Sequence, residues 1–424
     1  MSEGSHDPEP QPVQSRRVTR AQDLTCTSRA ADLDPGDPPA GVQVSAFRSP
    51  RRELWGMGEA LRIELPAPWP DHVARVSEEL AAITSDDEVR APGSGPVAFG
   101  ALPFDRRAAA TLVVPTVTFG RSAEGARWMT TVGPHGVDLS TTSWPAGEPR
   151  TPTEVRIRSA EPSEAWAQSV AEATRLIHDG DVTKVVLARE LCVESDVHLD
   201  AATLLARLRA THPAALCFAV DGFVGASPEL LVSRVDDIVR AHPMAGTTPR
   251  TGEPEADQRR AAELLSSAKN RSEHQITIDV VHDTLLPWCS FLDAEPAPSV
   301  VPAGPVQHLA TVVEGRLSHP PPPVLDLVAA LHPTPAVGGW PRDAALEVID
   351  ELEPADRGRY AGPVGWIDAA GNGAWAVGIR SVQLEGERAR LFAGVGVVAD
   401  SDPAAELEET RAKAQAVLGT LLRL

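Results

Sequence analysis

Short apolar runs joined by tight turns are the feature that most limits how this chain can fold. Residues 216–227 read LCFAV-DG-FVGAS, in which Asp221 and Gly222 separate two apolar runs. An Asp-Gly pair in this position favours the backbone twist of a two-residue hairpin turn. Short apolar runs separated by a tight turn also occur in residues 229–242, with the turn at Asp236-Asp237, and in residues 365–398. Because a hairpin joins antiparallel neighbours, these stretches predict antiparallel sheets.

Helical patterns lie between the strands. Apolar side chains recur along one helical face in residues 164–178, and residues 254–286 have a helical composition with no glycine. Asp402 followed by Pro403 is typical of a helix start, so we expect a terminal helix there. Helices that cover antiparallel sheets indicate an α+β fold rather than an alternating parallel sheet.

The domain boundaries follow from composition. Residues 1–40 are rich in Pro, Asp, Ser and Gln and contain few large apolar residues, so we expect a disordered N-terminal tail. From residue 41 onward strand and helix patterns continue without a long linker. Apolar residues make up 42% of the chain, which is enough for a sizeable core. We therefore predict one globular domain over residues 41–424.

Charge and cysteine content exclude several classes of protein. The 39 Lys and Arg residues are outnumbered by 59 Asp and Glu residues, and the resulting net charge of −20 disfavours binding to nucleic acid or anionic membranes. The four cysteines form no CxxC pair, which argues against a zinc site and favours a reducing compartment. No apolar run approaches the roughly 18–20 residues of a membrane span, and the N-terminus lacks a signal-peptide pattern. A cytoplasmic protein is expected.

Two residues at strand ends are candidates for acid–base chemistry. Lys184 stands at the edge of the apolar run in VTKVVLARE (182–190), and Glu229 directly follows Ser227-Pro228 at the start of another run. Burial in a cleft would raise the pKa of such a carboxyl towards the range of an acid catalyst. Each pattern is equally compatible with the polar end of an ordinary buried strand, so neither establishes a site alone.

Two further features lie near the C-terminus. GVGVVA (394–399) matches part of a dinucleotide-binding pattern, but the strand runs through its glycines and DSDP separates it from the next helix. Close approach of a ligand to the strand backbone is the better interpretation.

In the terminal helix Glu406, Glu409 and Lys413 form a stripe beside the apolar face. By itself that stripe is typical of a solvent-exposed helix.

Taken in order, these and further motifs resemble one enzyme family. They are Lys184 in TKVVLAR, Glu229 in FVGASPELLV, Gly246 and Thr247 in HPMAGTTPR, Glu273 in KNRSEHQ, HPTPAVGG (332–339), ELEPADRGRYAGPVGW (351–366), Arg380 in VGIRS, LFAGVGVV (391–398), and Glu409 with Lys413 in ELEETRAKAQ. The series resembles the chorismate-utilising enzymes: isochorismate synthases, salicylate synthases, and the synthase subunits of anthranilate and aminodeoxychorismate synthase. The resemblance covers residues 160–424. It implies large twisted antiparallel sheets packed face to face, with helices outside them.

Within this family the resemblance is closest to isochorismate synthases. Members that use water carry a lysine at the position of Lys184, which ammonia-using members usually lack. Pro335-Ala336 after Thr334 also matches the isochorismate synthases, whereas salicylate and anthranilate synthases tend to have threonine in place of Ala336. The implied reaction adds water at C2 of chorismate, removes the C4 hydroxyl and shifts the ring double bonds. The resemblance assigns the base to Lys184 and the acid to Glu229.

The resemblance also implies ligands for a metal and for the substrate. Glu273 and Glu409 match the family's Mg²⁺ carboxylates, and Glu406 matches a further carboxylate that assists the metal through water. The residues expected around chorismate are Gly246, Thr247, His308, Ala336, Arg380, Gly396 and Lys413. Ser272 and Asn270 depart from the family pattern next to Glu273, which leaves the surroundings of that carboxylate open.

Two other functions remain compatible with the sequence. Salicylate synthase, which adds pyruvate elimination at the same site, is the enzymatic alternative. A catalytically silent chorismate-binding protein is the alternative from another class. The sequence does not separate menaquinone from siderophore biosynthesis. No glutamine amidotransferase subunit is expected, and a monomer is favoured.

Overall fold

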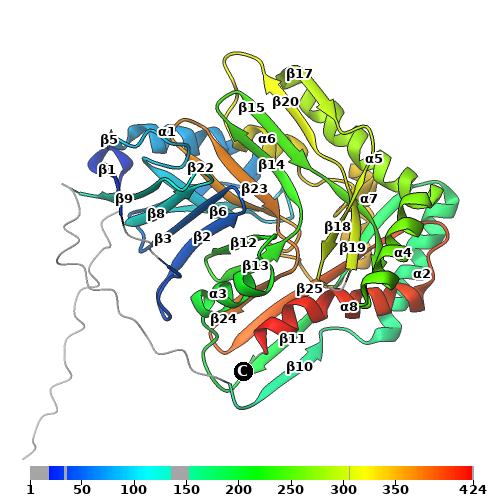
Figure 1. Cartoon of the computed structure of the whole chain (residues 1–424). Helices are drawn as coiled ribbons and strands as arrows, with labels where there is room; N and C mark the ends of the chain where they lie inside the picture. The colour runs from blue at the N-terminus through cyan, green and yellow to red at the C-terminus, as the bar shows by residue number, and fades with distance from the viewer. Residues whose placement is uncertain (1–18, 33–35, 135–151, 305, 423–424) are drawn as a thin grey trace, which may run out of the picture.

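The computed structural model describes residues 19–32, 36–134, 152–304 and 306–422. Within these ranges the strands form two large sheets and one small sheet, and helices cover their outer faces (Figure 1). A cluster that includes Phe47, Phe99, Phe218 and Trp366 fills the space between the two large sheets. The predicted α+β fold with large sheets packed face to face is confirmed.

The largest sheet joins strands from both ends of the chain. In sheet order its strands are β10 (Val155–Ser159), β11 (Lys184–Ser195), β25 (Arg388–Val397), β24 (Ser381–Glu385), β13 (Phe223–Ser227), β12 (Leu216–Val220), β2 (Val44–Ser49), β3 (Arg52–Met57), β8 (Val117–Ser122), β9 (Arg127–Gly133), β1 (Thr25–Ala30) and β5 (Thr84–Asp87), with β21 (Gly339–Trp340) beside β11. Among these described strands only β1 and β5 pair in parallel, and the other pairs are antiparallel.

The second large sheet and the small sheet complete the framework. The second sheet contains β17 (Cys289–Ala294), β20 (Val313–Leu317), β15 (Ile238–His242), β14 (Leu230–Val235), β23 (Gly373–Val377), β22 (Pro363–Asp368), β6 (Val97–Ala101), β7 (Ala110–Val114) and β4 (Leu61–Leu65). The small sheet contains β16 (Met244–Pro249), β19 (Val306–Ala310) and β18 (Ser299–Ala303).

Helices pack on these sheets in two groups. The α-helices are α1 (Ala74–Ala82), α2 (Ser163–Asp179), α3 (Ala201–Thr211), α4 (Pro254–Ser266), α5 (Ala268–Leu285), α6 (Val324–Leu331), α7 (Arg342–Leu352) and α8 (Pro403–Leu421), and the 3-10 helices are Ala21–Asp23, Trp69–His72 and Leu286–Trp288. Helices α2, α3, α7 and α8 pack on the largest sheet, whereas α4 and α5 pack on the small sheet and α6 on β14. Figure 1 shows α8 lying along β11 and β25.

The hairpins predicted at 216–227 and 229–242 are confirmed. Strands β12 and β13 meet at Asp221 (φ 48°) and Gly222 (φ 76°), both in the left-handed region that this tight turn requires. Strands β14 and β15 turn at Asp236, whose φ is 55°.

The structure adds detail to one prediction within the globular region and corrects another. Residues 254–286 are not one helix, because Ser267 ends α4 and its side chain accepts from the backbone N–H of Asn270 to cap α5. Residues 365–398 form the expected strands, but the β22–β23 hairpin belongs to the second sheet and the β24–β25 hairpin to the largest sheet. The chain crosses between the sheets at Gly378–Arg380.

The predicted disordered tail over residues 1–40 is wrong in part. Residues 25–30 form β1, which pairs with β9 and β5, and Leu24 and Cys26 are buried in the core. Polar composition hid this short strand, because its buried side chains alternate with polar, partly buried ones. Residues 1–18 and 33–35 lie outside the described residues.

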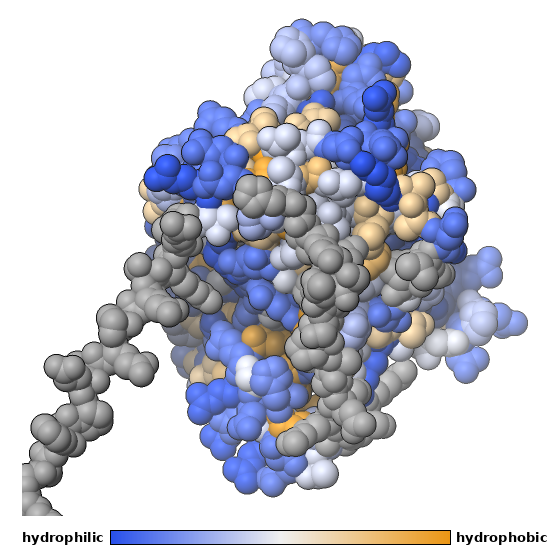
Figure 2. Space-filling view, turned by 90° about the vertical axis from the view of Figure 1, so that its left-hand side faces the viewer, coloured by the Kyte–Doolittle hydropathy of each residue, from blue (hydrophilic) through white to orange (hydrophobic). Residues whose placement is uncertain are grey.

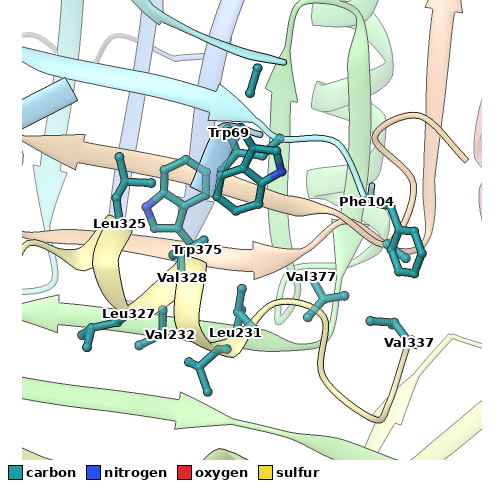
Figure 3. Packing of buried hydrophobic residues seen from close by; sticks show 14 of the residues in the cluster. Trp69, Phe104, Leu231, Val232, Leu325, Leu327, Val328, Val337, Trp375 and Val377 are labelled. Carbon is teal, nitrogen blue, oxygen red and sulfur yellow. The ribbon is translucent and has the colours of Figure 1, made fainter. Parts of the chain in front are cut away.

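The largest hydrophobic cluster anchors the loop that follows α6. The apolar residues of α6 recur at positions 324, 327, 328 and 331, and all four are buried. Figure 3 shows this face of α6 against strand residues Leu231 and Val232, with Phe104 and Val337 at one end of the same core. The segment 332–338 is therefore attached to a rigid helix, since buried apolar surface resists separation.

The molecular surface is strongly polar. Figure 2 shows mainly hydrophilic residues on one face, with hydrophobic residues confined to small areas, as the net charge of −20 leads one to expect. Among the described helices, none combines the length and the apolar character that a membrane crossing requires.

Candidate active site

A cavity of about 240 Å³ lies where the three sheets and helices α5 and α8 meet. Its lining comes from β11, β25, β16 and β19, from the residues just after β13, and from the crossing between β23 and β24. All twelve residues predicted for the site line it: Lys184, Glu229, Gly246, Thr247, Glu273, His308, Ala336, Arg380, Gly396, Glu406, Glu409 and Lys413.

One face of the β11–β25 pair forms a wall of the cavity. Side chains along a strand alternate between its two faces, so Lys184 and Val186 point to the same side. Gly394 and Gly396 of β25 lie on that side too, and Gly396 leaves room for the lysine. A Cβ atom on Gly396 would approach Lys184 Cε to 2.9 Å. The glycine-rich stretch therefore makes space for a side chain of the site.

Lys184 is buried and paired with a carboxylate. Its side chain is 6% exposed, and Nζ donates to Oε1 of Glu273 at 2.7 Å. Burial acts to raise the pKa of Glu273, but the charge and hydrogen bond of Lys184 outweigh it and hold the pKa below the ordinary value. Glu273 is thus an anion in the described site.

In contrast to Glu273, Glu229 has a raised pKa. It is 3% exposed, and burial raises its pKa to about 8, although a hydrogen bond from the Met244 backbone and the charge of Lys184 act against this. A carboxyl group with this pKa is protonated at neutral pH, so it can donate a proton inside the cavity.

Cationic and neutral donors line another part of the cavity. Arg380 has a positive φ of 53°, which places it in the tight crossing between the two large sheets. Its Nε atom is buried without a hydrogen-bond partner. An unsatisfied buried guanidinium donor favours an anionic ligand, since leaving it unpaired costs free energy.

His308 and Thr247 face each other across strands β16 and β19. Thr247 Oγ1 lies 3.0 Å from His308 Nδ1, and burial holds the pKa of the imidazole well below its ordinary value. The ring is therefore neutral. Gly246, with φ 74°, sits in an irregularity of β16 directly before Thr247. These groups present polar atoms to a ligand without adding charge.

Three carboxylates lie together at the helix end of the cavity. Glu273 comes from α5, and Glu406 and Glu409 come from the first turns of α8. One oxygen of each is engaged: Glu273 by Lys184, Glu409 by Lys413 at 2.6 Å, and Glu406 by the hydroxyl of Ser401 at 2.8 Å. Within the described chain their second oxygens make no hydrogen bond or ion pair.

This donor set fits Mg²⁺. Hard oxygen ligands suit that ion, and Mg²⁺ commonly takes only one or two protein carboxylates while keeping waters and substrate oxygens. Across the described ranges no three His, Cys, Asp or Glu side chains converge closely enough to hold a metal by themselves. The two observations agree if the carboxylates supply part of the coordination shell and the substrate supplies the rest.

Several residues that line the cavity were not among the predicted site residues. They are Tyr360, Lys269, Asn270 and Ser401, together with apolar lining residues such as Val186. A signal for Lys269 was present in the composition, because the chain contains only three lysines among its 39 basic residues, at 184, 269 and 413. All three line this one cavity. Tyr360 is likewise the only tyrosine of the chain.

Comparison with known proteins identifies the family. The sequence model of the family described as "Chorismate binding enzyme" matches residues 45–422. The chain belongs to the chorismate-binding enzymes. Isochorismate synthase DhbC of Bacillus subtilis is 41% identical over 355 residues, which cover 81% of this chain and 84% of that protein. Isochorismate synthase EntC of Escherichia coli is 35% identical over 381 residues, covering 88% and 93%.

Solved structures agree with this assignment. DhbC of Bacillus anthracis has a TM-score of 0.75 at 34% identity and covers 90% of this chain and 96% of its own. MenF, the menaquinone-specific isochorismate synthase of Escherichia coli, has a TM-score of 0.79 at 24% identity, covering 96% and 97%, which supports the fold alone. In this chorismate-binding enzyme the cavity is accordingly the candidate active site.

Proposed function

We propose that this chorismate-binding enzyme is an isochorismate synthase that requires Mg²⁺ and serves menaquinone or siderophore biosynthesis. The observation that carries the proposal is the meeting of Lys184, a protonated Glu229 and three carboxylates in one cavity. Isomerisation of chorismate by water needs a base, an acid and compensation for substrate charge, and these groups supply each of them.

The acid–base step is assigned to two residues. Lys184 takes a proton from the water that attacks C2, and Glu229 gives a proton to the hydroxyl that leaves C4. One water enters and one leaves while the ring double bonds shift, so atoms and charge balance. General acid–base catalysis of this kind contributes about 10²–10⁴-fold for each group.

The ion pair between Lys184 and Glu273 bears on this role. Lys184 Nζ donates to Glu273 in this structure, so the two side chains must separate before Lys184 can accept a proton from water. Glu273 is also one of the carboxylates that would hold Mg²⁺ together with Glu409, and Glu406 would assist through water. If Glu273 held the metal, Lys184 would be free to face the water. A bound Mg²⁺ would supply charge neutralisation for a carboxylate of chorismate.

The remaining anionic groups of chorismate are assigned to the other side of the cavity. The guanidinium of Arg380 and the ammonium of Lys413 supply positive charge, and the backbone at Gly246, Thr247 and Gly396 supplies N–H donors. His308 and Ala336 complete the surroundings of the ring. The buried, unpaired Nε atom of Arg380 supports this assignment.

We also propose that residues 41–424, together with strand β1, act as one catalytic domain. Strands from residues 44–57 and from residues 381–397 are joined in the largest sheet through β12 and β13. Separating the N-terminal from the C-terminal half would break that sheet and expose its core.

Identifying the product formed from chorismate tests the proposed function. Purified protein with chorismate and Mg²⁺ should yield isochorismate as the main product by chromatography, and removing divalent cations with a chelator should abolish turnover until Mg²⁺ is restored. Salicylate plus pyruvate in place of isochorismate would identify a salicylate synthase. Chorismate that binds but returns unchanged would identify a silent chorismate-binding protein.

A further inference from the structure

Strand β11, which carries Lys184, lacks a strand partner along part of one edge. On that edge β21 pairs with Lys184 and Val185, and β10 pairs with the strand only from Leu191 onward. No strand of the described structure fills the interval. Backbone groups in such a gap need other partners, because unpaired buried polar groups cost free energy.

A buried ion pair fills the gap. Arg357 and Glu353 have side chains 2% and 7% exposed, and Arg357 donates to both Glu353 oxygens at 2.5 and 2.8 Å. Arg357 Nη2 also donates to the Val186 carbonyl at 2.6 Å, and Glu353 Oε1 accepts from the Ala188 N–H at 2.7 Å. The pair therefore makes two of the bonds that a neighbouring strand would otherwise make, at the Val186 carbonyl and the Ala188 N–H.

The same guanidinium holds a second wall of the cavity. Arg357 Nη1 donates to the Val337 carbonyl at 2.9 Å, and Val337 lines the cavity beside Ala336. The guanidinium also lies over the ring of Phe104, with Cζ 4.3 Å from the ring centroid. The planar guanidinium thus joins the Lys184 strand to the Ala336–Val337 wall, in addition to the direct bond from the Val186 N–H to the Gly338 carbonyl at 2.9 Å.

We propose that the Glu353–Arg357 ion pair is a positioning element that holds Lys184 in register with the opposite wall of the cavity, so that its loss impairs the chemical step more than chorismate binding. This rests on the proposed function of Lys184. Neither residue lines the cavity, so both act through the backbone of others. Lysine cannot replace Arg357, because it lacks the planar fork that reaches Glu353, Val186 and Val337 together.

Arg357→Lys tests this with Glu353→Gln as a milder second variant. We expect kcat for isochorismate formation to fall about 10²-fold in Arg357→Lys, as for a small misplacement of a catalytic group. KM should change by less than about threefold, because the charged groups assigned to the carboxylates of chorismate lie outside the two segments that Arg357 joins. Glu353→Gln keeps an oxygen for the Ala188 N–H and should lose less of kcat.

A matched control lies on the neighbouring strand β25. Arg390 pairs with Glu190 of β11 at 2.5 Å but holds no cavity residue, so Arg390→Lys should leave kcat near that of the wild type. Hydrogen exchange gives a readout without turnover: Arg357→Lys should accelerate exchange in both 184–190 and 334–338, and Arg390→Lys should not affect 334–338. Wild-type kcat in Arg357→Lys, equal losses in the two lysine variants, or unchanged exchange would each overturn the positioning role. A wild-type enzyme that makes no isochorismate would overturn the proposed function, while the exchange result would still decide the coupling.

Lys269 supports a second, independent inference. Of the three lysines, 184 and 413 are paired with Glu273 and Glu409, whereas Lys269 makes no hydrogen bond or ion pair within the described chain. It is exposed in the first turn of α5, where a positive charge opposes the helix dipole. Its placement is therefore unfavourable for the helix itself.

The geometry points to Lys269 as the cation that draws the dianionic substrate into the cavity. The protein carries a net charge of −20 and so repels an anion over most of its surface. The solvent-facing ammonium of Lys269 adds positive charge at the cavity, where it acts on Glu273 and Glu406 and opposes this repulsion of an anion. This inference also rests on the proposed substrate.

Lys269→Met should lower kcat/KM for chorismate about tenfold at low ionic strength while kcat changes little, because steering acts on encounter rather than chemistry. The difference from wild type should shrink as salt is added. Lys269→Arg should restore kcat/KM, and Arg271→Met, which removes an exposed charge from the same helix outside the cavity, should match the wild type. An unchanged kcat/KM in Lys269→Met, or an equal loss in Arg271→Met, would overturn this role. If wild type binds no chorismate, the failure lies with the proposed substrate.

Discussion

Replacing Glu229 with Gln is expected to lower kcat about 10³-fold while chorismate binding persists. The amide has the shape of the protonated carboxyl, so the buried cavity should accept it, but it cannot transfer a proton to the leaving hydroxyl. Glu161→Gln is a matched control, because burial also raises the pKa of that half-buried carboxyl and it does not line the cavity. Steady-state kinetics with product separation measure both variants.

The same residue predicts the alkaline side of the pH profile. The acid form of Glu229 is the active one and its pKa lies at about 8, so kcat should be sustained below that pH and fall as pH rises through it. In Glu229→Gln the residual activity should lose this particular fall. Full activity of the variant, or a wild-type profile flat from neutral pH to well above 8, would contradict the role of Glu229 as the acid.

Replacing Lys184 with Met is expected to lower kcat about 10³-fold or more, because the attacking water loses its base. Methionine fills similar space along β11 without charge, so the strand should stay intact. Calorimetry should show a second effect, tighter Mg²⁺ binding, since Glu273 loses the ammonium that occupies one of its oxygens at 2.7 Å. A loss of activity with this gain in metal affinity would be hard to attribute to misfolding.

Arg189→Met serves as the control for Lys184. Arg189 is a buried cation on the same strand, but it does not line the cavity and donates to Ser163. Its replacement should leave kcat and Mg²⁺ affinity close to those of the wild type, whatever it does to stability. If Lys184→Met retained wild-type kcat, another group would have to activate the water.

Much of the architecture could be read from local patterns. The Asp221-Gly222 turn, the strand around Lys184 and the helix opened by Asp402 are set by interactions among neighbours in the chain, and each was predicted where it occurs. The errors arose where distant contacts decide. Residues 25–30 become a strand only because β9 and β5 lie beside them. The break at Ser267 is a different case, because its side chain caps α5 through the nearby N–H of Asn270, which the helical composition of residues 254–286 did not reveal.

In the candidate site, too, some features follow from the sequence alone and others depend on distant contacts. By itself the sequence determined which residue types stand in which order, and this ordered series indicated the family and all twelve proposed site residues. Only the tertiary structure decided their states. It buries Glu229 enough to raise its pKa to about 8, pairs Lys184 with Glu273, and completes the edge of β11 with Glu353 and Arg357. Burial and pairing depend on elements far apart in the chain, whereas turns and periodicity depend on neighbours, and for this reason the order of residues predicted the site but not how it is held.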